Sequence, residues 1–151
     1  MIEERFADME IKYRINNISE IEYSLNYDIK DDIVKENVSF EISHREKAIK
    51  ERKEIIVEVF TQLHDDSNNI LAKNGIRASF GLEPFSEAIV STEDDSLTTN
   101  VPEVIDTFIS ISIGALRGIL SKNLKGTPLD GCVLPMIPMS LIKRQAKRVS
   151  K

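Results

Sequence analysis

Few side chains in this 151-residue chain could act as nucleophiles, general bases or metal ligands. It has one cysteine, Cys132, and two histidines, His44 and His64. A nucleophilic site needs a serine or cysteine beside a base. Both histidines fall in or beside segments that we expect to form hairpin turns, and Cys132 has no histidine near it in the sequence. We therefore interpret Cys132 as a small buried or half-buried apolar side chain, and a lone cysteine also excludes an intrachain disulfide.

The run His64-Asp65-Asp66 is the best candidate for a set of metal ligands. It continues into Ser67-Asn68-Asn69, and such a cluster is typical of a turn, which is the interpretation that we favour. Asp94-Asp95 is likewise interpreted as a loop. The chain has no phosphate-binding GxxxxGK[ST], no GxGxxG after a strand, no HExxH and no cysteine pair. We expect no cofactor, no metal and no catalysis; an enzyme would need His64 or Cys132 in a polar cleft with a second ligand or base.

Composition indicates one soluble domain over residues 1–151. Apolar residues make up 41% of the chain and charged residues 30%, which are ordinary values for a globular domain. The N-terminus lacks the pattern of a secretory signal, so we expect a cytoplasmic protein. The longest uncharged apolar run, Thr107 to Leu116, is shorter than the ~20 residues of a spanning helix. We expect no membrane span.

Apolar residues on alternate positions predict four strands. They fall at residues 9–29, 38–42, 55–63 and 76–82; at Asn16-Asn17 the first has a bend or bulge, or divides into two strands. Because the strands follow one another without a helix between them, we expect an antiparallel sheet. Eight of the eleven residues from His44 to Glu54 are charged, and we interpret this run as a solvated hairpin loop.

The period then changes to that of a long helix from about Pro102 to Lys122. Its apolar residues extend round most of the circumference, so it needs cover on more than one side. A repeat of small residues every four positions would allow another backbone to approach closely. We assign this side to an oligomer interface; the alternative is that the chain's own C-terminal segment covers it. The predicted interface residues are Ser110, Ile113, Gly114, Arg117 and Gly118.

The C-terminal part predicts a turn over residues 126–131, an extended Leu134–Pro138 segment and a short amphipathic helix from Met139. The predicted fold class is thus α+β: a four-stranded antiparallel sheet packed by a long helix and this short one. Residues 143–151 hold five basic residues and no acid, although the whole chain carries −5. This tail either contacts an acidic partner or is a solvated helix end.

This order of elements resembles the SecB family of cytoplasmic export chaperones and SecB-like chaperones. The likeness is carried by residues 18–23, 38–42 and 55–59 in the strands, 118–120 in the helix, Gly126-Thr127-Pro128-Leu129, and Leu134-Pro135-Met136-Ile137-Pro138. It implies a dimer of dimers with the long helices between sheets. It also implies an ATP-independent holdase that binds unfolded or pre-export polypeptides in apolar grooves.

The resemblance places the client groove between the first-to-second strand connection, the sheet edge and the last helix. The implied client-binding residues are Tyr23, Leu25, Tyr27, Ile29, Leu134, Met136, Ile137, Met139 and Ile142. Apolar surface that a core does not use marks an interaction site, although periodicity alone also allows all of it to be core. Arg77 in the fourth strand and the basic tail argue against hand-over to the SecA motor. Chaperones that guard an antitoxin remain an alternative.

A second function class is an oligomeric adaptor whose basic helix, Lys143 to Lys151, holds a specific acidic protein or an RNA. The net charge of −5 argues against general nucleic-acid binding. Salt separates the two classes, because charge-led binding weakens strongly with added salt, whereas apolar holding does not.

Overall fold

The structure is a computed structural model that describes residues 2–6, 9–91, 97–138 and 140. Its main element is a five-stranded antiparallel sheet in the order β1-β2-β5-β4-β3. The strands are β1 (Ile2–Phe6), β2 (Met9–Leu25), β3 (Ser39–Ile49), β4 (Glu54–His64) and β5 (Ile70–Glu83). The four long strands confirm the predicted antiparallel sheet and α+β class. The short β1, which forms a hairpin with the start of β2, was not predicted.

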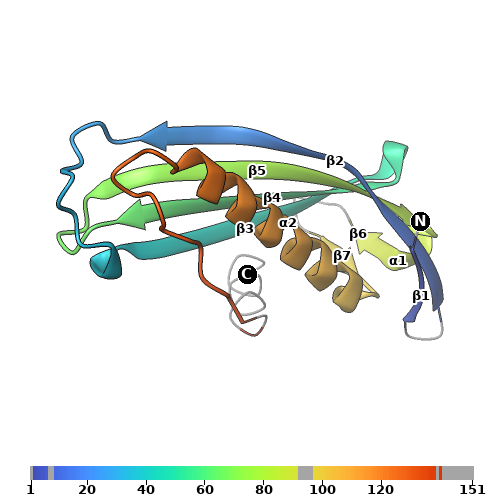
Figure 1. The fold of residues 1–151 in the computed structure, drawn as a ribbon. Coiled ribbons are helices and arrows are strands. Elements are labelled where there is room, and N and C mark those ends of the chain that lie inside the picture. Colours follow the sequence, from blue (N-terminus) through green and yellow to red (C-terminus); the bar gives the residue numbers. More distant parts are fainter. Residues whose placement is uncertain (1, 7–8, 92–96, 139, 141–151) are drawn as a thin grey trace.

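One long helix, α2 (Pro102–Asn123), lies across one face of this sheet (Figure 1). It begins and ends close to the predicted residues. Between β5 and α2 are α1 (Phe85–Ala88) and a small ladder of β6 (Ile89–Ser91) with β7 (Thr98–Thr99). The predicted C-terminal helix, with Met139 and Ile142, lies outside the described residues.

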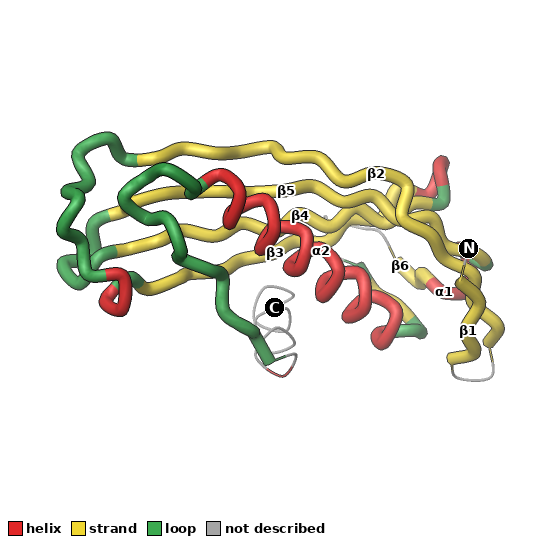
Figure 2. The backbone as a smooth tube through the Cα atoms, in the orientation of Figure 1, coloured by secondary structure: helices red, strands yellow, loops and turns green. Residues whose placement is uncertain are grey.

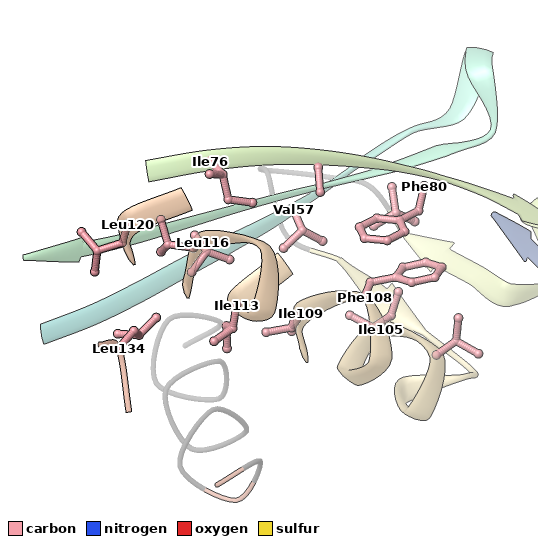
Figure 3. Packing of buried hydrophobic residues seen from close by; sticks show 14 of the residues in the cluster. Val57, Ile76, Phe80, Ile105, Phe108, Ile109, Ile113, Leu116, Leu120 and Leu134 are labelled. Atoms are coloured by element: carbon pink, nitrogen blue, oxygen red, sulfur yellow. The ribbon is translucent and has the colours of Figure 1, made fainter. Parts of the chain in front are cut away.

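The core forms between α2 and the inner face of the sheet, the face that α2 covers. On β4 every second residue from Ile55 to Leu63 is buried on this face. Phe108 of α2 stacks on Phe80 of β5 with ring centroids 4.2 Å apart, and the ring of Tyr13 meets it edge-on at 5.5 Å. Figure 3 shows Phe108 and Phe80 together with the row of α2 side chains that points at the sheet.

Helix α2 is also long and apolar enough to cross a membrane, by length and composition alone. The expectation of no membrane span was based on the uncharged run alone, and length and composition by themselves do not contradict it. Eight side chains of α2 are buried, mostly against the sheet, and a core helix has this composition for that reason.

The predicted hairpin loop at His44–Glu54 is wrong. β3 continues to Ile49, and only the short 3₁₀ helix η2 (Lys50–Arg52) with Lys53 makes the turn. His44 and Glu46 face inward and are partly buried, whereas Arg45 and Lys47 are exposed. A strand needs only alternation, and charged residues are common on an edge strand such as β3, so the density of charge did not indicate a loop.

Strand β2 is irregular where the sequence predicted. Its register with β5 shifts between Ile15 and Asn17, which confirms the bulge at Asn16-Asn17, and again between Glu20 and Glu22. The strand ends at Leu25, so the predicted extension to residue 29 is wrong. Tyr27 and Ile29 lie instead in the β2–β3 connection (residues 26–38), which ends in the short 3₁₀ helix η1 (Lys35–Asn37) (Figure 2).

Candidate functional site

The β2–β3 connection and the turn between β4 and β5 border an open hollow of about 610 Å³. Aliphatic side chains from the connection and from the start of β5 form part of its lining. They are Ile29, Ile33, Val34, Val38, Ile70 and Leu71. The hollow can therefore receive apolar groups, and it contains Ile29, one of the predicted client-binding residues.

The rest of the lining of this hollow is polar and carries an excess of negative charge. Four aspartates, Asp28, Asp32, Asp65 and Asp66, contribute to it, with Lys30 as the one lysine among the lining residues. Asp65 accepts hydrogen bonds from the side chain and backbone of Asn69, at 3.0 and 2.8 Å, and these hold its pKa below the ordinary value. Asp65 thus organises the predicted turn.

The segment of residues 132–138, here called the strap, runs back from the turn that follows α2 without helix or strand structure. Leu134 anchors it, because its side chain is 1% exposed and belongs to the core (Figure 3). The prediction that Leu134 contributes to an exposed groove is therefore not met within this chain. Met136, two residues later, is 91% exposed, and Ile137 packs partly against the core.

The start of the strap lies beside the end of the β2–β3 connection. A Cβ atom at Gly131 would be 3.6 Å from Lys35 Nζ of η1. Cys132, the next residue, is buried, and this burial raises the pKa of its thiol. The two segments that the sequence predicted to form one groove therefore meet at one end of the sheet.

Large apolar side chains are exposed on the connection, at the start of β5 and on the strap, and we call this set of residues the junction surface. Tyr27 is 94% exposed on the connection. The members of the junction surface are Tyr27, Val34, Ile70, Val133 and Met136. Val34, Ile70 and Val133 were not predicted, because a single apolar residue in a polar stretch has no periodicity that would single it out.

Tyr23 and Leu25, also predicted for this groove, belong to β2 and lie differently. Leu25 packs partly against the core. The hydroxyl of Tyr23 donates a hydrogen bond to the backbone carbonyl of Asn123, 3.2 Å away. Burial raises the pKa of Tyr23, and the nearby Tyr27 and Glu20 add to the effect. Tyr23 therefore helps to hold the end of α2, although 38% of it remains exposed.

The outer side of α2, opposite the sheet, carries three of the five predicted interface residues. Ser110, Gly114 and Gly118 are exposed, and no described atom lies within 4 Å of a Cβ built at either glycine. Ile113 is buried, and Arg117 directs its guanidinium to the strap. Structure thus divides the predicted interface into an exposed small-residue stripe and two residues engaged within the chain.

A second exposed apolar strip lies on β2. β1 pairs only with the first residues of β2, Met9 to Tyr13. Within the described residues, the outer edge of β2 beyond Tyr13 has no neighbouring strand. Ile15 and Ile18, opposite Phe80 and Ala78 of β5, are 50% and 37% exposed. This edge and the stripe on α2 are the described surfaces suited to a second copy of the chain.

The residues considered for catalysis or metal binding are placed apart. His44 Nδ1 lies 3.0 Å from Glu46 Oε2, and His64 Nε2 lies 3.3 Å from Glu41 Oε2. Cys132 is a buried free thiol on the strap. In the part of the chain that the structure describes, no three His, Cys, Asp or Glu residues form a group that could hold a metal ion.

Comparison with known proteins shows the fold. No protein-family model matches the chain, and no curated protein matches its sequence. Among solved structures, it is similar to the Mycobacterium tuberculosis SecB-like chaperone Rv1957 in complex with a ChAD peptide from the HigA1 antitoxin Rv1956. The TM-score is 0.57 at 11% sequence identity, over 83% of this chain and 88% of that one. The chain therefore has the fold of a SecB-like chaperone.

Proposed function

We propose that this protein is an ATP-independent chaperone of the cytoplasm that holds unfolded polypeptides on the junction surface. The observation that carries the proposal is the exposure of large apolar side chains on both the connection and the strap, together with a partly aliphatic hollow beside the connection. Exposed apolar groups clustered in this way mark interaction sites. The SecB-like fold supports the same function.

The chemistry of the junction surface suits clients of varied sequence. Met136 has a flexible thioether side chain that can repack against different partners, and Tyr27 offers a large ring with a polar end. Both are more than nine-tenths exposed, so a client reaches them without rearrangement of the core. The aspartates of the hollow disfavour acidic client segments by charge repulsion.

We also propose that the protein is a homo-oligomer, a dimer of dimers, joined through the outer side of α2 and the free edge of β2. Helix glycines destabilise a helix relative to alanine. Gly114 and Gly118 make no close contact with other described parts of the chain, so none of the described residues requires their small size. A second copy that packs closely on the stripe supplies the reason for two glycines.

The proposal is tested by suppression of the aggregation of an unfolded model protein, measured by light scattering at increasing chaperone ratios. We expect suppression near one oligomer per client without ATP, with little change between low and high salt. If binding collapses with added salt, the adaptor with the basic tail is supported instead. If no suppression occurs in either condition, the chaperone proposal is rejected.

One class of client is favoured by a specific observation: the similar SecB-like chaperone was solved with a peptide from an antitoxin. An antitoxin is therefore the second candidate client beside pre-export proteins. Co-expression tests for an antitoxin client, and deletion of the chaperone tests for an exported client. An antitoxin client would remain soluble only with this chaperone, and an exported client would accumulate in the cytoplasm when the chaperone is deleted.

A further inference from the structure

The strap is held by very few described hydrogen bonds, and Arg117 donates two of them. Arg117 Nε donates to the carbonyl of Leu134 at 2.8 Å, and a terminal nitrogen donates to the carbonyl of Pro135 at 2.9 Å. Pro135 and Pro138 have no N–H of their own. The strap therefore forms no ladder of backbone hydrogen bonds like those that hold strands or helices.

Two anchors act on neighbouring atoms of the strap. The side chain of Leu134 is buried in the core, while the carbonyls of Leu134 and Pro135 are held by Arg117 from α2. The buried side chain of Leu134 fixes how deeply the strap lies. A single anchor of this kind still lets the strap rotate about that side chain. The planar guanidinium binds two successive carbonyls and removes that rotation.

The residue after this double contact is Met136, whose side chain is 91% exposed. Its direction follows from the orientation of the peptide groups at Leu134 and Pro135. We infer that Arg117 is a positioning residue, which orients the strap so that Met136 and Val133 complete the junction surface. This inference rests on the proposed function, because it gives Arg117 a role in holding clients through the strap.

Cys132 provides a direct readout of the strap. It is the chain's one cysteine, lies at the start of the strap and is 7% exposed. Because its side chain is buried, a thiol reagent reaches it when the strap moves. The rate of Cys132 modification therefore reports strap opening at a native residue, with no engineered label. This rate does not depend on whether the protein binds clients.

The experiment compares wild type with Arg117→Met, Arg117→Lys and the control Lys122→Met, an exposed position at the end of the same helix. For Arg117→Met we expect Cys132 modification to accelerate roughly tenfold or more, because loss of even one charge-assisted hydrogen bond shifts an opening equilibrium by about that factor. Arg117→Lys should restore part of the protection, since an ammonium can bind one carbonyl but not both in the same plane. Lys122→Met should react like wild type.

Client holding is measured on the same proteins, with circular dichroism and solution mass as checks of fold and assembly. We expect Arg117→Met to lose most aggregation suppression while fold and mass stay as in wild type, and Arg117→Lys to recover part of it. Unchanged Cys132 modification in Arg117→Met would overturn the inference, as would faster modification with full client holding. If wild type itself fails to hold clients, the proposed function is rejected and the role in client holding with it, while Cys132 modification still decides whether Arg117 fixes the strap.

Discussion

Replacement of Gly114 by leucine separates two cases. It should stabilise the fold if the outer side of α2 faces solvent, and it should weaken assembly if a second copy packs there. Gly114 lies in the interior of a 22-residue helix, and no described atom is within 4 Å of a Cβ at this position. A glycine in a helix interior costs roughly 1 kcal/mol relative to alanine, and leucine is nearly as good a helix former as alanine. In an isolated protomer, Gly114→Leu should therefore stabilise the fold.

The magnitudes of the two cases are well separated. A gain of roughly 1 kcal/mol raises the melting temperature of a domain of this size by about 2–4 °C. If a second copy packs on the stripe, overpacking costs about 1–3 kcal/mol per site. A twofold interface contains the site twice, so the dissociation constant should rise between about thirtyfold and about twenty-thousandfold.

Solution mass by light scattering over a dilution series, together with thermal unfolding, measures both quantities. We expect wild type to have a multiple of the 17.1 kDa protomer mass and Gly114→Leu to dissociate at far higher concentration. Lys47→Leu, on the exposed outer face of β3 and away from both α2 and the free edge of β2, is the control for an added apolar side chain and should assemble as wild type does. An unchanged mass with a higher melting temperature would refute the packing of a second copy on Gly114.

Three further predictions concern the junction surface, the outer face of the sheet and the core. The double variant Tyr27→Asp/Met136→Asp should abolish aggregation suppression. Its circular dichroism should match wild type, because both side chains are more than nine-tenths exposed. Suppression at the wild-type level would reject this surface. Burial alone would raise the pKa of Glu58, but hydrogen bonds from Arg45 and Arg77 hold it below its ordinary value of 4.5. Ionised Glu58 therefore stabilises the fold above that pH, and the stabilisation is lost as the pH falls through the lowered pKa. Glu58→Gln should melt lower than wild type at pH 7, and the difference should shrink below pH 4.5; a difference that does not depend on pH would contradict this account. Phe108→Ala should lower the free energy of unfolding by about 3–5 kcal/mol, since the ring is fully buried against Phe80 and Tyr13; a loss below about 1 kcal/mol in a denaturant titration would show that the stacked rings do not anchor α2.

Local patterns predicted the elements of the fold well where one face of an element is buried. Alternation placed the four long strands, and Pro102 with the apolar residues behind it placed α2. The bulge in β2 followed from a break in the same alternation. Charge density failed at β3, because Arg45 and Lys47 point to solvent from a strand whose other face is partly buried.

The candidate site was predictable only in outline. Both chain segments of the junction surface were identified, but Leu134 is an anchor in the core, and the hydroxyl of Tyr23 is bonded to the end of α2. Val34 and Val133 join the surface although nothing in their sequence neighbourhood distinguishes them. An apolar residue type indicates that burial of the side chain is favourable. It does not indicate whether the core or a partner buries that side chain.

The sequence by itself determined the order of strands and helix and the shortage of groups for nucleophilic or metal chemistry. These properties depend on residue type and on spacing within one element, which local sterics and burial dictate. Only the tertiary structure decided that the connection and the strap meet, that Arg117 binds the carbonyls of Leu134 and Pro135, and that Gly114 faces outward. Each of these is a contact or an exposure between segments distant in the chain, set by how α2 packs on the sheet.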